Sequence, residues 1–328
     1  MPRPKSCWIN KPLQHPGRPA GRSGCAGAGG LRPPKPPCGR FARRASRTHP
    51  GSAQADRPCA LSDFAPKGAA VMKPSLSSSA LKYIALVAML LDHMAYYLSL
   101  PLPLRWVGRL AAPIFLYFVV EGFCHTRCFG RYLLRMYAVA VGMGLVNTLL
   151  ARCAAGFRPD GITPQNGICA TFFLLLLILR GLSLLQQRRW AAGLTLAAAP
   201  FVLPLLLARL LPGPVCSLLF GTVLPSPYSC EGGVPFLLLG LLLYAFRARR
   251  EIQLGAYVLF SLGVYLLPAL QSGCSVSLLL WGYYQWMMVF AVLPLACYNG
   301  VRGSAPRWLF YVFYPAHIYL LWALGALL

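Results

Sequence analysis

The chain contains repeated apolar segments, each about as long as the hydrocarbon core of a bilayer is thick. A membrane-spanning helix needs about 20 mostly apolar residues. Hydrophobic residues make up 57% of the chain and charged residues 12%, which is too apolar for a soluble globular protein of this size. We therefore predict an all-α, polytopic transmembrane helical bundle of about nine spans. They lie at residues 80–100, 108–124, 132–151, 168–185, 190–211, 232–246, 252–270, 277–297 and 308–328.

Two further topological features follow from the breaks between these segments. With the amino terminus placed in the cytoplasm, eleven arginines fall on the inner side of the nine spans and five on the outer side. The positive-inside rule therefore predicts a cytoplasmic amino terminus and an external carboxyl terminus. Residues 212–231 include an apolar stretch that is too short to span and is flanked by prolines, which predicts an interfacial or re-entrant segment.

The first 71 residues have a different composition. The formal net charge of the chain is +24, and a large share of its arginine, lysine and proline lies in this region. Such a composition cannot bury a core, so we predict a disordered tail, with Met72 as an alternative start of the protein. The other interpretation of its arginines is an arm for nucleic acid or anionic lipid; composition favours the tail, and we predict no nucleic-acid partner. The cysteines show no zinc-ligand spacing, so no metal site is predicted.

Ionisable side chains within the predicted spans are few and expensive in hydrocarbon, which makes each a functional hypothesis. At about 1.5 Å per residue, Asp92 and Glu121 both fall near mid-membrane in neighbouring antiparallel spans. This depth predicts that Asp92, His93 and Glu121 lie at one level as an acid/base cluster. The alternative is a structural ion pair, for example Asp92 or Glu121 with Arg109, that holds two helices together.

Basic residues gather after the second predicted span. His125 is followed by Arg127, Arg131 and Arg135, and arginine suits bidentate contact with phosphate; the alternative is that they are topology signals. His317 follows Pro315 in the last span. Either a proline-disturbed helix exposes this imidazole in a pocket, or it is a structural, hydrogen-bonded histidine.

An ordered set of motifs resembles the TraX family of bacterial membrane proteins. The motifs are LKYIALVAMLLDHM at 81–94, GRLAAPIF at 108–115, EGFCHT at 121–126, YQW at 284–286, YNG at 298–300 and FYVFYPAHI at 310–318. The resemblance covers residues 81–328, so we expect a TraX-like domain over residues 72–328. It implies a multi-pass protein of the bacterial cytoplasmic membrane.

The resemblance also implies an activity. The family is named for a protein that acetylates the amino terminus of F-type conjugative pilin and is related to the membrane acyltransferase-3 group. It implies acetyl transfer, with acetyl-CoA as co-substrate and no bound cofactor, to an amine or hydroxyl of a pilin-like peptide or a glycan. His93 is then the base, with Asp92 or Glu121 tuning it. The candidates for binding donor or acceptor are Arg109, His125, Arg127, Arg131, Arg135, Asn299, Tyr314 and His317.

Two other functions fit the same polar residues. Intramembrane Asp, Glu and His also make the proton relays of a proton-coupled transporter, although the two halves of the sequence show none of the internal similarity that many transporters have. In a non-catalytic membrane chaperone or scaffold, the polar groups would only hold helices together.

Overall fold

The computed structural model describes residues 75–153, 158, 160–164 and 167–328. The predictions for residues 1–71 lie outside this range. Within the described residues every regular element is a helix, apart from one isolated β-bridge between Leu76 and Tyr298, which confirms the all-α class. The helices are α1 (Ser78–Tyr97), α2 (Pro103–Gly108), α3 (Ala111–His125), α4 (Phe129–Cys153), α5 (Ile168–Gln186), α6 (Trp190–Leu210), α7 (Gly213–Gly221), α8 (Gly233–Ala245), α9 (Arg250–Ser261), the π-helix η1 (Leu262–Leu266), α10 (Leu267–Gln271), α11 (Val276–Trp281), the 3₁₀-helix η2 (Tyr284–Ala291), α12 (Val292–Ala296) and α13 (Arg307–Leu327).

In the part of the chain that the structure describes, six helices are long and apolar enough to cross a membrane, which supports a membrane protein but does not confirm nine spans. They are Pro103–His125, Phe129–Arg152, Ile168–Gln186, Trp190–Leu210, Arg250–Gln271 and Trp308–Leu327. Helix α1 is also long, at 20 residues, but it carries Lys82, Asp92 and His93 and falls outside this set. The cytoplasmic position of the amino terminus stays a prediction.

Two predicted spans are shorter or more broken than the sequence indicated. The segment 277–297 is divided among α11, η2 and α12, and its apolar helical part is only Tyr284–Ala296. The segment 232–246 contains α8, which has 13 residues and would be only about 20 Å long, short of the roughly 30 Å hydrocarbon core. Residues 213–221 form the nine-residue helix α7, too short to span, as expected.

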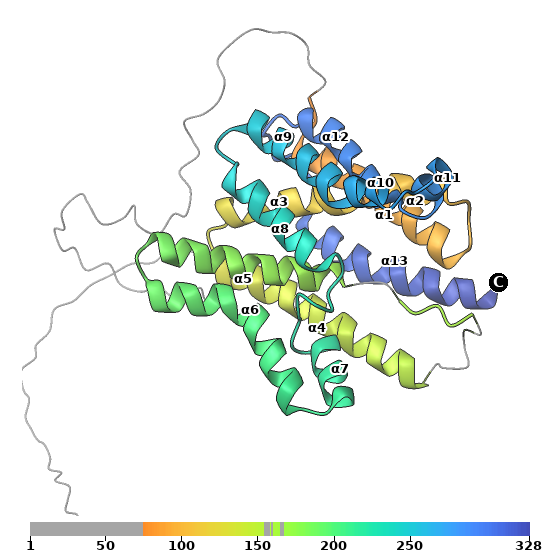
Figure 1. The fold of residues 1–328 in the computed structure, drawn as a ribbon, viewed down its shortest axis with the longest axis horizontal. Helices are drawn as coiled ribbons and strands as arrows, with labels where there is room; N and C mark the ends of the chain where they lie inside the picture. The colour runs from red at the N-terminus through yellow and green to blue at the C-terminus, as the bar shows by residue number, and fades with distance from the viewer. Residues whose placement is uncertain (1–74, 154–157, 159, 165–166) are drawn as a thin grey trace, which may run out of the picture. The chain divides into compact units, whose positions relative to one another are not determined.

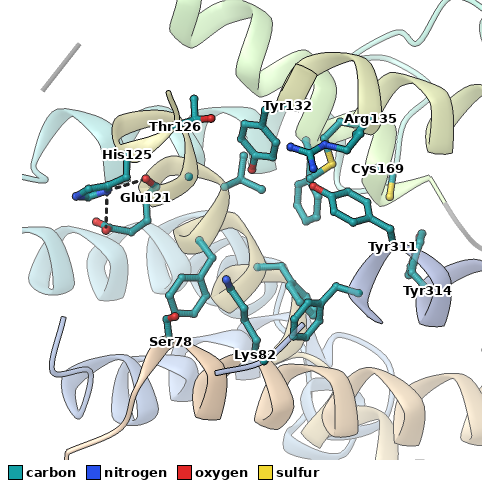
Figure 2. Close-up of a pocket in the computed structure, with 18 of the residues that line it drawn as sticks. Ser78, Lys82, Glu121, His125, Thr126, Tyr132, Arg135, Cys169, Tyr311 and Tyr314 are labelled. Carbon is teal, nitrogen blue, oxygen red and sulfur yellow. Dashed lines mark hydrogen bonds and ion pairs between the residues drawn. The ribbon is translucent and has the colours of Figure 1, made fainter. Parts of the chain in front are cut away.

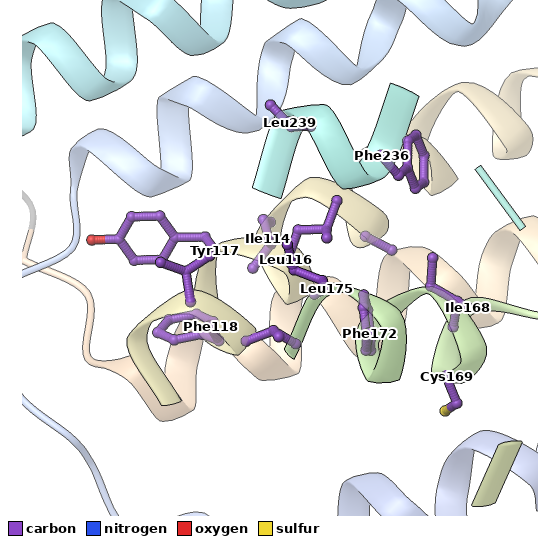
Figure 3. Close-up of a cluster of buried hydrophobic side chains, with 14 of the residues drawn as sticks. Ile114, Leu116, Tyr117, Phe118, Ile168, Cys169, Phe172, Leu175, Phe236 and Leu239 are labelled. Atoms are coloured by element: carbon purple, nitrogen blue, oxygen red, sulfur yellow. The ribbon is translucent and has the colours of Figure 1, made fainter. Parts of the chain in front are cut away.

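Helix α5 is central and α6 is peripheral. In the spans that contain them, 67% of the apolar window of α5 is buried against 11% for α6, although the two helices pack on each other (Figure 1). Lipid tails are as apolar as leucine, so helix association in a bilayer depends on close packing. Side chains from α3, α5 and α8 provide such packing in Figure 3, where Leu116 and Leu175 are fully buried.

A close helix contact brings two arginines onto the carboxylate of α1. Gly108, at the end of α2, lies so near Asp92 that a Cβ on the glycine would come within 2.2 Å of the Asp92 Cβ. A glycine is therefore needed at this crossing. The same approach places Arg105 and Arg109, which flank the glycine, beside Asp92.

Candidate functional site

Two buried histidines from opposite ends of the described chain meet at the centre of the candidate site. His93 on α1 and His317 on α13 lie with Nδ1 of the first 2.7 Å from Nε2 of the second. His93 is 8% exposed and His317 is 5% exposed. The sequence predicted both as functional candidates without predicting that they touch.

The hydrogen bonds of this pair define which nitrogen carries a proton when both rings are neutral. His317 Nδ1 lies 2.7 Å from the carbonyl oxygen of Phe313, which can only accept, so this nitrogen donates. His317 Nε2 is then the acceptor for His93 Nδ1–H. The consequence is a lone pair on His93 Nε2, which is the form that a general base requires.

Asp92 is bound to arginines of α2 and of the link to α3. Its carboxylate lies 2.5 Å from Arg109 Nη2 and 3.2 Å from Arg105 Nε. Arg109 also donates to the side-chain oxygen of Gln285 at 2.9 Å. This is the structural ion pair that the sequence left open as the alternative for Asp92, and it joins α1, the α2–α3 segment and η2.

Glu121 does not lie at the level of Asp92 and His93, so the prediction of a three-residue cluster is wrong. Asp92 packs against Gly108, and Glu121 follows 13 residues later, which places it about 20 Å further along the antiparallel helix. There it faces His125, with 3.5 Å between Oε2 and Nδ1. The prediction failed because it measured the depth of Glu121 as if the second span began at the membrane surface near Gly108, whereas Gly108 packs against Asp92 itself.

A large cavity opens at this end of the helices, and we name it the basic cavity. Its volume is about 1160 Å³, somewhat larger than the roughly 300–1,000 Å³ usual for ligand sites. Cationic side chains line it, and Figure 2 shows Lys82 and Arg135 pointing into the space while His125 contacts Glu121 on the wall. The ionisable residues of the lining other than tyrosine and cysteine are Lys82, Glu121, His125, Arg127, Arg131, Arg135 and Arg302.

The inner end of the basic cavity lies close to the histidine pair. Met89 and Tyr314 line it, one helical turn before His93 and His317 respectively. Phe313 also lines the cavity, and its ring stacks on His317 with centroids 4.7 Å apart. A ligand that filled the cavity would extend from the basic residues almost to the two imidazoles.

The residues predicted to bind donor or acceptor divide into two groups. Five of them line the basic cavity: His125, Arg127, Arg131, Arg135 and Tyr314. The other three lie elsewhere. Arg109 forms an ion pair with Asp92, and His317 is hydrogen-bonded to His93. The side-chain oxygen of Asn299 accepts from the backbone N–H of Val301, and the backbone N–H of Asn299 donates to the carbonyl of Leu76.

Lys82 and Arg302 line the basic cavity but were not among the predicted site residues. Lys82 had a detectable signal, because a lysine is rare in an apolar helix. Arg302 had none beyond the general excess of arginine in loops. Among the described residues no group of three or more His, Cys, Asp and Glu side chains is placed to hold a metal ion.

The helices and the buried polar pairs between them define a helical membrane protein. A family model described as TraX protein matches residues 77–325, so the chain belongs to the TraX family. It is also 29% identical, over 252 residues, to the "Probable fimbrial assembly protein FimC, serogroup H1" of Dichelobacter nodosus, an alignment that covers 75% of this chain and 94% of that relative. No solved structure matches.

Proposed function

We propose that this protein is an integral membrane acyltransferase that moves an acetyl group from acetyl-CoA to an amine or hydroxyl. The observation that carries the proposal is the buried His93–His317 pair, which lies one helical turn beyond Met89 and Tyr314 in the lining of the basic cavity. The pair supplies a positioned base, and the cavity has the charge and size for an anionic thioester donor.

The proposed reaction needs one base and no bound cofactor. The lone pair of His93 Nε2 takes the proton from the acceptor N–H or O–H as the acceptor attacks the thioester carbonyl carbon. A new C–N or C–O bond forms, the C–S bond breaks, and the departing CoA sulfur takes the proton from His93. His317 stabilises the imidazolium that forms in between, because its Nε2 accepts the Nδ1–H of His93.

The basic cavity supports a donor that carries several phosphates. Arginine binds phosphate oxygens in pairs, and each such charge-assisted hydrogen bond contributes about 1.5–3 kcal/mol. Arg127, Arg131 and Arg135 lie on one wall, with Lys82 and Arg302 also in the lining. The apolar inner part, which includes Leu86, Met89 and Val119, would exclude water from the thioester.

The fimbrial relative supports a further part of the proposal. That protein's name assigns it to fimbrial assembly. We therefore propose that the acceptor of the present protein is a membrane-associated or exported component of a pilus-like structure, either a peptide or a glycan, and that the protein acts in the bacterial cytoplasmic membrane.

The test is an assay of acetyl transfer in proteoliposomes. Purified protein is supplied with acetyl-CoA carrying a labelled acetyl group, and label is measured in a membrane fraction that contains candidate acceptors. We expect label in an acceptor and free CoA in equal amounts. A protein that binds acetyl-CoA but releases no CoA above the His93→Ala background would contradict the proposal. Proton movement into the proteoliposomes that depends on a transported solute would instead favour the proton-coupled transporter.

A further inference from the structure

A second cavity, of about 750 Å³, lies beside the carboxyl-terminal half of α4, and we name it the polar cavity. Hydroxyl and amide side chains are frequent in its walls. They are Asn147, Thr148, Thr163, Thr222, Ser226 and Ser229, with Cys230 and Glu231 beside them.

The polar cavity and the basic cavity flank the histidine pair. On α13, Tyr314 lines the basic cavity and Trp322 lines the polar one, with His317 between them. On α1, Met89 lines the basic cavity, and the carbonyl of Tyr97 accepts from Arg158 in the wall of the polar cavity. His93 is midway, about 6 Å along the helix axis from each.

The charge of the polar cavity comes from Glu231. Arg158 also lines the cavity, but its charge is neutralised by Asp160, whose carboxylate lies 2.9 Å from Arg158 Nε. The Nη1 and Nη2 groups of Arg158 donate to the carbonyls of Trp322 and Tyr97. The carboxylate of Glu231 lies within hydrogen-bond reach of the N–H groups of Gly167 and Ile168, which fix its direction. A carboxylate has about four lone-pair positions, so acceptor capacity remains for a ligand.

The surroundings of Glu231 favour a cationic ligand. The Glu231 side chain is exposed in the polar cavity, yet desolvation by the surrounding protein raises the pKa of its carboxyl, and the Arg109 guanidinium opposes this shift. Arg109 is itself held by Asp92 at 2.5 Å, so it gives little compensation. A cationic ligand in the cavity would supply the positive partner charge that stabilises the ionised carboxylate.

We propose that the polar cavity is the acceptor site and that it takes an amine, bound in its ammonium form against Glu231. This inference rests on the proposed function, and it narrows the acceptor from an amine or hydroxyl to an amine. Donor and acceptor then reach His93 from opposite sides, so neither blocks the other's entry. Glu231 is a binding residue in this arrangement and takes no part in bond making.

Two free thiols allow both cavities to be probed in one molecule. Cys230 lines the polar cavity next to Glu231, and Cys128 lines the basic cavity. Each thiol is treated with 2-aminoethyl and 2-sulfonatoethyl methanethiosulfonate, one cationic and one anionic, and modification is followed by peptide mass spectrometry of the full chain. Burial raises the pKa of the Cys230 thiol and slows both reagents equally, so the ratio of the two rates reports local charge.

We expect Cys230 to favour the cationic reagent and Cys128 the anionic one. Glu231→Gln should lower the cation-to-anion ratio at Cys230 by about tenfold, from the loss of one nearby charge, and leave Cys128 unchanged. Glu251→Gln, on the exposed first turn of α9, is the matched control and should change neither ratio. An unchanged ratio at Cys230 in Glu231→Gln would overturn the assignment.

A second measurement needs no variant. In the wild-type protein, propylamine should protect Cys230 but not Cys128 from modification, whereas propanol should protect neither. Equal protection by the amine and the alcohol would overturn the ammonium site.

The transfer assay separates this inference from the proposed function. With propylamine as acceptor, Glu231→Gln should raise KM for the amine, whereas the control Glu251→Gln should leave KM for the amine and the hydrolysis of acetyl-CoA unchanged. Transfer by the wild type with no effect of Glu231→Gln on KM would overturn the acceptor site alone. Charge preference and amine protection at Cys230 without any transfer would overturn the proposed function and leave an ammonium site.

Discussion

The basic cavity and the polar cavity share walls from α4, α5 and α13 but differ in charge. The shared helices contribute mostly neutral side chains near the boundary, such as Val139 and Ile168 on one side and Ala140 and Ala170 on the other. The charge comes from helix ends and loops, with Arg127 and Arg131 around the start of α4 and Glu231 before α8. The comparison teaches that one apolar partition can separate a cationic lining from an anionic one when the charged groups stand at its outer edges.

The largest effect is expected from removing His93, the proposed base between the two cavities. His93→Ala should lower acetyl transfer by about 10² to 10⁴, the usual loss when a general base is removed. Both cavities should keep their charge preference in the thiol-labelling experiment. Transfer within a few-fold of the wild type, at matched protein quantity and thermal stability, would show that His93 is structural.

Removal of the partner histidine should have a smaller effect. His317→Ala takes away the acceptor for His93 Nδ1–H, and the loss of one buried hydrogen bond of about 1–3 kcal/mol corresponds to roughly a ten- to hundredfold lower kcat. The pH dependence of kcat should shift as well, since the acceptor that supports protonated His93 is gone. A lower melting temperature with an unchanged pH profile would indicate a packing role only.

Neutralising the basic cavity should weaken donor binding without affecting the acceptor. Arg131→Gln and Arg135→Gln should each raise KM for acetyl-CoA by about tenfold, the value of one charge-assisted hydrogen bond. KM for the acceptor should stay constant. Arg189→Gln, on an exposed residue before α6, is the control, and an equal rise in KM there would point to general surface charge rather than the cavity.

The smallest expected effect concerns stability and the polar cavity. Glu231 is exposed in the polar cavity, but desolvation by the surrounding protein raises the pKa of its carboxyl above the ordinary value of 4.5. The folded state therefore favours the protonated carboxyl, and a small part of the stability is lost as pH rises through the folded pKa. Glu231→Gln cannot ionise, so this variant does not lose stability as the pH rises. Its melting temperature should match the wild type in acidic buffer and exceed it above neutrality, and a variant less stable than the wild type at high pH would contradict the pKa shift.

The sequence predicted the helical membrane class and most of one cavity wall, but not the pairing of its polar groups. His125, Arg127, Arg131 and Arg135 are neighbours in sequence, so any helix or loop there keeps them together. His93 and His317 are 224 residues apart, and their contact depends on which helices pack, which one sequence does not state. Depth alone misplaced Glu121, because a residue's level in a bundle depends on where its helix begins.

Glu231 shows another limit of reading residues by position. It is the last residue of the 212–231 segment, which the sequence predicted to be interfacial or re-entrant without assigning any residue in it a role. Its chemistry arises from the N–H groups of Gly167 and Ile168 and from desolvation by the surrounding protein, and both are tertiary effects. The broken segment 277–297 has a related cause, since its apolar composition fits a long helix while the chain there changes from α11 to η2 and α12.

The separation of the two histidines sets an order of events during synthesis. Asp92 meets Arg109 across 17 residues, so this charge is neutralised as soon as α2 has entered the membrane. The partner of His93 is synthesised 224 residues later, which takes roughly 10 to 45 s at about 5–20 residues per second. A neutral imidazole tolerates that delay in lipid far better than a carboxylate. The nascent protein would thus stay inactive until its final helix is in place, and chains truncated before α13 would be inserted but inert.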